Sequence, residues 1–148
     1  MQDVNTIVVI IILVMSVVLH EVAHGYSAFY FGDKTAFYAG RLTLNPLKHL
    51  DWFSSILLPA MLIYFKSPLV FGAAKPVPVN LTNLDSGRWP RIVVAISGIA
   101  TNFFIAIIFS IIVYISIHLG FSREMISVMN TIILINLSLG FFNLLPIP

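Results

Sequence analysis

The sequence predicts an all-α polytopic membrane protein with three core transmembrane helices. Two observations carry this prediction. Hydrophobic residues make up 59% of the 148 residues and charged residues only 9%, against roughly 25% charged in an ordinary soluble domain. The apolar residues also gather in three long runs, at 4–31, 92–119 and 125–148. Eight basic and six acidic residues cannot cover the surface of a soluble fold of this size.

Each long run can cross a bilayer. About 20 apolar residues at 1.5 Å per residue span the hydrocarbon core of about 30 Å. The first run, 4–31, carries the only cluster of ionisable residues inside a span. The third run, 125–148, has no charged residue at all. The mean hydropathy of the whole chain, +0.99, agrees with a protein whose main solvent is lipid.

A further apolar stretch, 52–65, is shorter than a span. It is 14 residues long, contains Pro59 and ends at Lys66. This length is typical of a re-entrant or interfacial segment. The alternative is a fourth membrane segment over 52–74, in which the long side chain of Lys66 reaches the membrane surface.

The basic residues predict the orientation of the chain. Seven of the eight lie between the first and second long runs: Lys34, Arg41, Lys48, Lys66, Lys75, Arg88 and Arg91. If 52–65 enters and leaves on one side, all seven share that side, and the positive-inside rule makes it cytoplasmic. We therefore expect a multi-pass protein of the cell membrane with 32–91 in the cytoplasm and 119–124 outside. The net charge of +2 is then a topology signal, and we expect no nucleic-acid partner.

The cytoplasmic region is expected to contain a small extended or β structure. Residues 35–44 are rich in β-formers, with Gly40 as a turn. The segment 75–80 contains Pro76 and Pro78. Two prolines remove backbone donors and favour extended neighbours, so this segment is not helical. An edge strand or a polyproline conformation is expected there.

The first span contains the motif HEVAH, from His20 to His24. Positions i and i+4 lie one above the other on a helix face, so two imidazoles can bind one Zn²⁺ ion. Glu21 then lies beside the metal, where its carboxylate can take a proton from an activated water. The alternatives are polar residues at a membrane interface or a proton relay. Ionisable groups cost about 2.5–3.5 kcal/mol each near mid-membrane, which favours a functional site.

A hydrolytic zinc site needs a third protein ligand. Glu124 is expected on the opposite side of the membrane. His49 or Asp51 could reach the metal from the cytoplasmic side, although an interfacial cap or ion pair is the more ordinary role for each. No cysteine is present to serve as a ligand.

The motifs resemble the site-2 protease family of intramembrane zinc metalloproteases, in the small bacterial type. HEVAH lies in a span and is followed by GRLTLNP at 40–46 and FGAAKPVPVN at 71–80. SGIATN at 97–102 is similar to the small-residue and Asn motif of the second core helix, with Ile99 where a Pro is common. NLLPIP at 143–148 is similar to the start of the third motif. The resemblance implies His20 and His24 as zinc ligands and Glu21 as the catalytic acid and base.

One departure from the family concerns the third ligand. In the family the third motif continues to an Asp-Gly pair whose Asp binds zinc, and no residue here matches it. We therefore expect 1–148 to be a single intramembrane metalloprotease domain that is truncated at its C-terminal end. The chain as written is expected to be inactive without that ligand.

Two asparagines in apolar spans are further candidates. The resemblance places Asn102 and Asn143 near the active site, where a side-chain amide can hold a substrate backbone or an oxyanion. The alternative is a hydrogen bond between helices, worth about 0.6 kcal/mol on average.

The predicted function is the hydrolysis of peptide bonds in or near transmembrane segments of membrane-protein substrates, with Zn²⁺ as the cofactor. The active site is expected near the cytoplasmic side. A substrate helix must unwind before attack, because its amides are internally bonded, and an extended 75–80 segment can pair with the unwound strand. The alternatives are a metal-dependent transporter and a catalytically inactive membrane scaffold.

Overall fold

The computed structural model describes residues 4–67 and 74–145. Three long helices form a bundle: α1 (Thr6–Tyr30), α4 (Arg88–His118) and α5 (Arg123–Leu144). All three are long and apolar enough to cross a membrane, with mean hydropathies of 2.6, 2.4 and 1.8. They overlap the three predicted runs, so the all-helical class with three helices compatible with membrane spans is confirmed for the described residues.

Local side-chain bonds fix where these helices begin. The Asn5 side chain accepts a hydrogen bond from the Ile7 N–H at 2.8 Å and caps α1. Ser122 does the same for α5 through the Met125 N–H. These caps satisfy amides that have no partner inside the helix. Gly120, with φ of +73°, makes the tight turn between α4 and α5.

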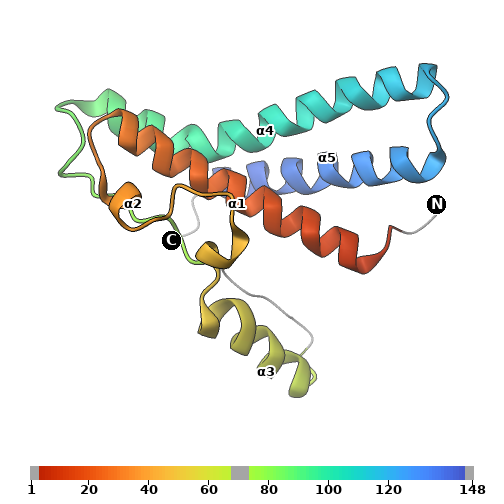
Figure 1. Ribbon diagram of the computed structural model, residues 1–148, viewed down its shortest axis with the longest axis horizontal. Helices are drawn as coiled ribbons and strands as arrows, with labels where there is room; N and C mark the ends of the chain where they lie inside the picture. Colours follow the sequence, from red (N-terminus) through yellow and green to blue (C-terminus); the bar gives the residue numbers. More distant parts are fainter. Residues whose placement is uncertain (1–3, 68–73, 146–148) are drawn as a thin grey trace.

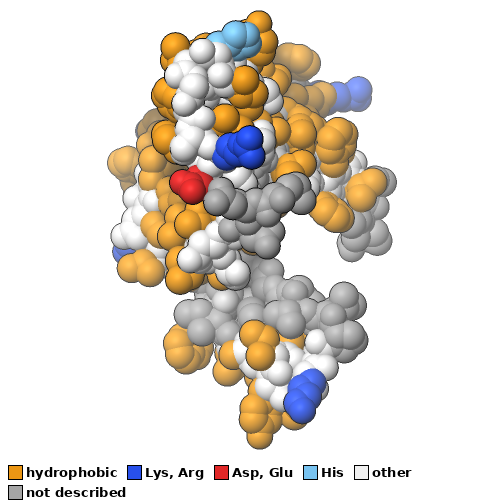
Figure 2. Space-filling model, turned by 90° about the vertical axis from the view of Figure 1, so that its right-hand side faces the viewer, with side chains coloured by type: hydrophobic (Ala, Val, Ile, Leu, Met, Phe, Trp, Pro, Cys, Tyr) orange, Lys and Arg blue, Asp and Glu red, His pale blue; other side chains and the backbone are white. Residues whose placement is uncertain are grey.

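Small and amide side chains join the helices of the bundle. Gly140 of α5 lies against the Phe103 ring of α4. Asn136 of α5 is fully buried and donates to the Ser16 hydroxyl of α1 at 2.9 Å. The outer surfaces are apolar, and Figure 2 shows hydrophobic side chains over most of the described face that it views. Such a surface suits lipid, in which polar contacts must lie between the helices.

Between α1 and α4 the chain forms short helices. These are α2 (Thr35–Tyr38), η1 (Pro46–His49), η2 (Trp52–Leu57) and α3 (Leu58–Tyr64). The expectation of an extended or β structure over 35–44 is wrong at its start, because Thr35–Tyr38 is helical. The Asp33 carboxylate accepts from both the amide and the hydroxyl of Thr35, and such local bonds favour a turn over a strand.

The 75–80 segment is not helical, as its two prolines predict. Residues 74–80, which we call the strap, carry no helix or strand assignment. No strand occurs in the parts of the chain that the structure describes. Three predicted features lie partly outside the described residues. These are residues 71–73 of the FGAAKPVPVN motif, part of the alternative span 52–74, and Pro146–Pro148 of the third motif.

The ambiguous apolar stretch forms one continuous helical segment, η2 followed by α3, that stands away from the bundle in Figure 1. The Asp51 carboxylate begins it by accepting from the Ser54 N–H at 3.0 Å. Trp52–Tyr64 is an apolar helix shorter than a membrane span. Its path into or along the membrane stays a prediction.

A buried carboxylate ties the end of α1 to the chain that precedes α4. Asp33 is 0% exposed. Its Oδ2 accepts from the Asn80 N–H at 2.7 Å, and its Oδ1 accepts from the Asn83 amide at 3.2 Å. The Asp85 N–H donates to the Phe31 carbonyl at 2.8 Å in the same contact. Asp33 therefore fixes one end of the strap against the C-terminal end of α1.

Hydrogen bonding decides the protonation of this carboxylate. Burial acts to raise the pKa of Asp33, but the hydrogen bonds from Thr35, Asn80 and Asn83 outweigh burial and hold the pKa below its ordinary value. A carboxyl group whose pKa is lowered by folding stabilises the fold above its ordinary pKa of about 3.9. That stabilisation is lost as the pH falls through the lowered value.

We predict that Asp33→Asn frees the strap. The new NH₂ group opposes donors that now meet an anion, and hydrogen bonds to charged groups are worth about 1.5–3 kcal/mol. Amide hydrogen exchange around Asn80 should speed up roughly 10- to 100-fold at pH 7. The exchange rate of the variant divided by that of the wild type, both measured at the same pH, should fall toward one as the pH drops through the lowered pKa of Asp33. Asp85→Asn, at an exposed position of the same segment, is the control. A ratio that does not depend on pH would contradict the assignment.

Candidate metal centre

The two motif histidines meet on the inner face of α1. His20 Nε2 and His24 Nε2 lie 3.1 Å apart, and His20 is only 7% exposed. Two nitrogens that bind one tetrahedral zinc at roughly 2.0–2.1 Å lie about 3.3 Å from each other. The pair therefore fits the two nitrogen ligands of a zinc ion.

Gly98 of α4 makes room for the imidazoles. A β-carbon built at this position would lie 2.6 Å from His20 Nε2 and closer still to His24 Nε2. Real β-carbons do not approach other atoms so closely. The absence of a side chain at Gly98 therefore lets α4 pack directly over both rings.

The backbone of α4 orients His24. The Val94 carbonyl lies 2.7 Å from His24 Nδ1. A carbonyl only accepts, so Nδ1 carries the proton and Nε2 keeps its lone pair. The Ser97 hydroxyl also lies 3.2 Å from Nδ1. This arrangement is typical of a metal-binding histidine, whose second nitrogen donates to a fixed acceptor.

Asn102 occupies the equivalent position behind His20. Its side-chain amide lies 3.0 Å from His20 Nδ1 and is 0% exposed. With Nδ2 placed toward the ring, Asn102 Oδ1 is buried without a partner. Exchanging the amide O and N, which look alike in such assignments, lets Oδ1 accept from Nδ1–H of His20, and the neutral ring then keeps its lone pair on Nε2. Full burial favours this positioning role over the expected contact with substrate or an oxyanion.

Glu21 points away from the histidines and toward the strap. Its Oε2 accepts from the Val77 N–H at 2.8 Å. Val77 is buried and packs against Gly25, where a β-carbon would come within 2.9 Å of Val77 Cγ1. Gly25 lies one turn after Glu21 on α1. The strap thus crosses the helix at the motif and holds the carboxylate in place.

The other candidate residues lie elsewhere. His49 is buried and donates from Nε2 to the Thr43 carbonyl at 2.9 Å. Asp51 caps η2. Asn143 is exposed and donates to the Leu139 carbonyl of its own helix. Among the described residues there is no group of three or more His, Cys, Asp or Glu side chains that could hold a metal. The site therefore supplies two nitrogen ligands, and the Glu21 carboxylate lies on the neighbouring face of α1 against the strap.

The sequence did not predict three contributors to this centre: the Val94 carbonyl, the Val77 amide and Asp33. The first two are backbone groups, which no residue pattern marks. Asp33 does have a local signal. Its place in an Asp-Lys-Thr sequence directly after α1, with Gly32 before it, is the signal for a local turn.

Two curated proteins resemble the chain. One is "Putative zinc metalloprotease YwhC" from Bacillus subtilis (strain 168), which is 39% identical over 149 aligned positions that cover 94% of this chain and 63% of the relative. The other is "Putative zinc metalloprotease Rip2" from Mycolicibacterium smegmatis (strain ATCC 700084 / mc(2)155), which is 45% identical over 49 positions, or 33% of this chain and 19% of the relative.

The chain therefore spans less than two thirds of the length of the first relative. No family model matches it, and no solved structure matches it significantly. The two similarities support a zinc metalloprotease family. They agree with the geometry of the paired histidines and with the three apolar helices.

We predict that Gly98→Ala disrupts metal binding without weakening the helix. Alanine is the better helix former by about 1 kcal/mol, but its β-carbon must displace both imidazoles. Overpacking costs about 1–3 kcal/mol, so zinc affinity of the full-length protein should fall roughly 5- to 150-fold. Gly140→Ala, which meets only the Phe103 ring at 3.0–3.2 Å, should keep its zinc. Equal zinc affinity in the two variants would contradict the close approach at Gly98.

A second prediction separates Asn102 from the other buried amide. Asn102→Leu removes the acceptor behind His20 and should weaken zinc binding about 10- to 100-fold. Asn102→Asp keeps an acceptor and should recover most of the affinity. Asn136→Leu is the matched control, because Asn136 is equally buried but bonds to Ser16. Competition with a chelating dye measures the zinc affinity of all three variants. An equal loss of affinity in Asn102→Leu and Asn136→Leu would show that the effect comes from general packing and not from the bond to His20.

Proposed function

We propose that the protein is a zinc-dependent intramembrane endopeptidase of the site-2 type, which cleaves membrane-protein substrates in or next to their transmembrane segments. The observation that carries the proposal is the pair of Nε2 atoms 3.1 Å apart inside an apolar helix. Each imidazole has a fixed group behind it, Val94 or Asn102, which is the arrangement that a metal site needs. The named relatives support the same chemistry.

Zinc, when bound by His20, His24 and a further ligand, would activate a water molecule and polarise the scissile carbonyl. Glu21 lies about 100° around the helix from His20, on the neighbouring face of α1 that meets the strap. It accepts the proton of the attacking water and delivers it to the leaving amine. The Val77 N–H holds one carboxylate oxygen and limits the rotation of this side chain.

The depth of the site fits cleavage close to the cytoplasmic surface. His24 lies seven residues before Phe31, which is about 10 Å along the helix. The basic residues between the first two spans favour a cytoplasmic location for this end of α1. Water reaches the carboxylate from that side, past the polar groups of the strap and of residues 31–35. A substrate segment unwound there pairs with the strap.

Glu21→Gln tests the proposal, because it keeps the shape of the side chain and removes the base. The full-length variant should bind zinc like the wild type and cleave a transmembrane substrate at least about two orders of magnitude more slowly. Cleavage at the wild-type rate would remove Glu21 from the mechanism. Loss of zinc together with activity would make Glu21 a ligand. If vesicles that contain the wild-type protein pass metal ions and the protein does not cleave the substrate, a transporter would be favoured.

A further inference from the structure

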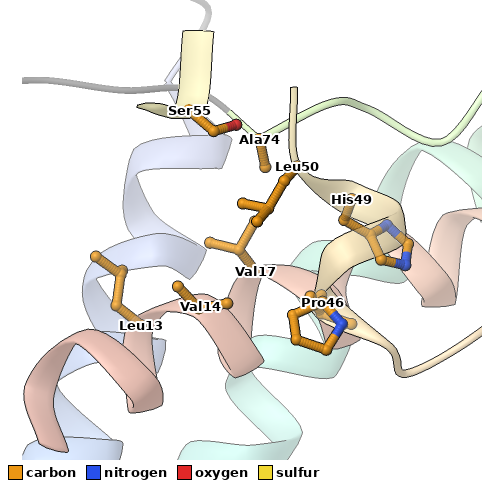
Figure 3. A pocket seen from close by; sticks show the side chains of 9 residues that line it. Leu13, Val14, Val17, Pro46, His49, Leu50, Ser55 and Ala74 are labelled. Carbon is orange, nitrogen blue, oxygen red and sulfur yellow. The ribbon is translucent and has the colours of Figure 1, made fainter. Parts of the chain in front are cut away.

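A groove lies on the face of α1 that carries Glu21. It has a volume of about 250 Å³. Its walls include Leu13, Val14 and Val17 from α1, Pro46 and Leu50 from the chain around η1, and Ala74 from the strap. Figure 3 shows the three α1 side chains facing Leu50 and Ala74 across it. We call this feature the α1 groove.

The groove lies about one helical turn before Glu21 along α1. Val14 and Val17 precede Glu21 by seven and four residues, so all three lie on one face of the helix. Ala74 begins the strap, and three residues later the Val77 N–H reaches Glu21 Oε2. Three extended residues span at most about 11 Å. The Lys75 N–H, which donates to the His49 carbonyl at 2.8 Å, fixes the strap to the groove wall between these points.

The lining of the groove is mostly apolar. His49 contributes to the wall but is 1% exposed. The Ser55 hydroxyl already accepts from the Asp51 N–H at 3.0 Å. The remaining walls are aliphatic. An occupant therefore meets hydrocarbon and gains about 25 cal/mol for each Å² of apolar surface that it buries.

The groove is small, with a volume of about 250 Å³. It can hold one or two apolar side chains of an extended segment. Val14 lies about 10 Å further along the helix axis than Glu21, on the side away from the cytoplasmic end of α1.

We propose that the α1 groove is the specificity pocket of the protease, and that it binds an apolar side chain of the unwound substrate on the membrane-interior side of the scissile bond. This inference rests on the proposed function. The groove selects substrates with a large aliphatic residue at one position, and Val17 and Leu50 set the size that it accepts.

Disulfide crosslinking tests occupancy without requiring catalysis. The chain has no cysteine, so Val14→Cys can be made in the Glu21→Gln protein with a single reactive thiol. The probe is a synthetic single-span leucine–alanine peptide with a Gly-Pro break near its cytoplasmic end and one cysteine on the membrane-interior side of the break. Val14→Cys should form the disulfide. Ile11→Cys, at a 56% exposed position outside the groove, should not. Equal crosslinking at both positions, or none at Val14→Cys because a lipid chain fills the groove, would overturn the proposal.

A specificity switch provides the second measurement. Val17→Phe fills the groove, so the ratio of kcat/KM for a substrate with Leu at the selected position to one with Ala should fall at least about tenfold. Ile11→Phe should keep the wild-type ratio. A ratio unchanged in Val17→Phe, with cleavage that still depends on Glu21, would overturn the groove and leave the protease proposal standing. Crosslinking at Val14→Cys with no cleavage by the wild type would instead overturn the protease and leave a peptide-binding groove.

Discussion

The close contact between α1 and α4 at Gly98 is the constraint on which the rest of the structure depends. Two imidazoles inside an apolar bundle need partners, because lipid offers none. The contact brings the Val94 carbonyl to His24 and the Asn102 amide to His20. It also aligns the two Nε2 atoms. With both rings facing α4, Glu21 falls on a different side of the helix, where it meets the strap.

Much of this architecture could be predicted from the sequence. The three spans follow from hydropathy, because a lipid-facing helix must be apolar over its whole length. The pairing of His20 with His24 follows from the pitch of a single helix. Contacts between helices were not predictable in the same way. The register that brings Gly98 over the imidazoles and Asn102 behind His20 depends on how two distant segments pack, and no local pattern records it.

The connecting region shows a different limit. The β-formers after residue 34 favour a strand, yet a strand gains its stability from a neighbour that pairs with it. Asp33 offers the chain a closer partner by accepting from Thr35 and Asn80 at once. One buried carboxylate thus decides both the short helix α2 and the path of the strap. The proline-rich 75–80 segment was easier to predict, since proline excludes helix whatever its surroundings.

The strap is fixed near both ends and is held in the middle by a single side-chain acceptor. Asn80 is bound to Asp33 and Lys75 to the His49 carbonyl, while Val77 is bound to Glu21. A peptide that takes the place of the Val77 amide needs to displace only the few residues between these anchors. Movements of short loops take nanoseconds to microseconds. A displacement confined to these few residues therefore exposes the Glu21 carboxylate without any change in the packing of the three long helices.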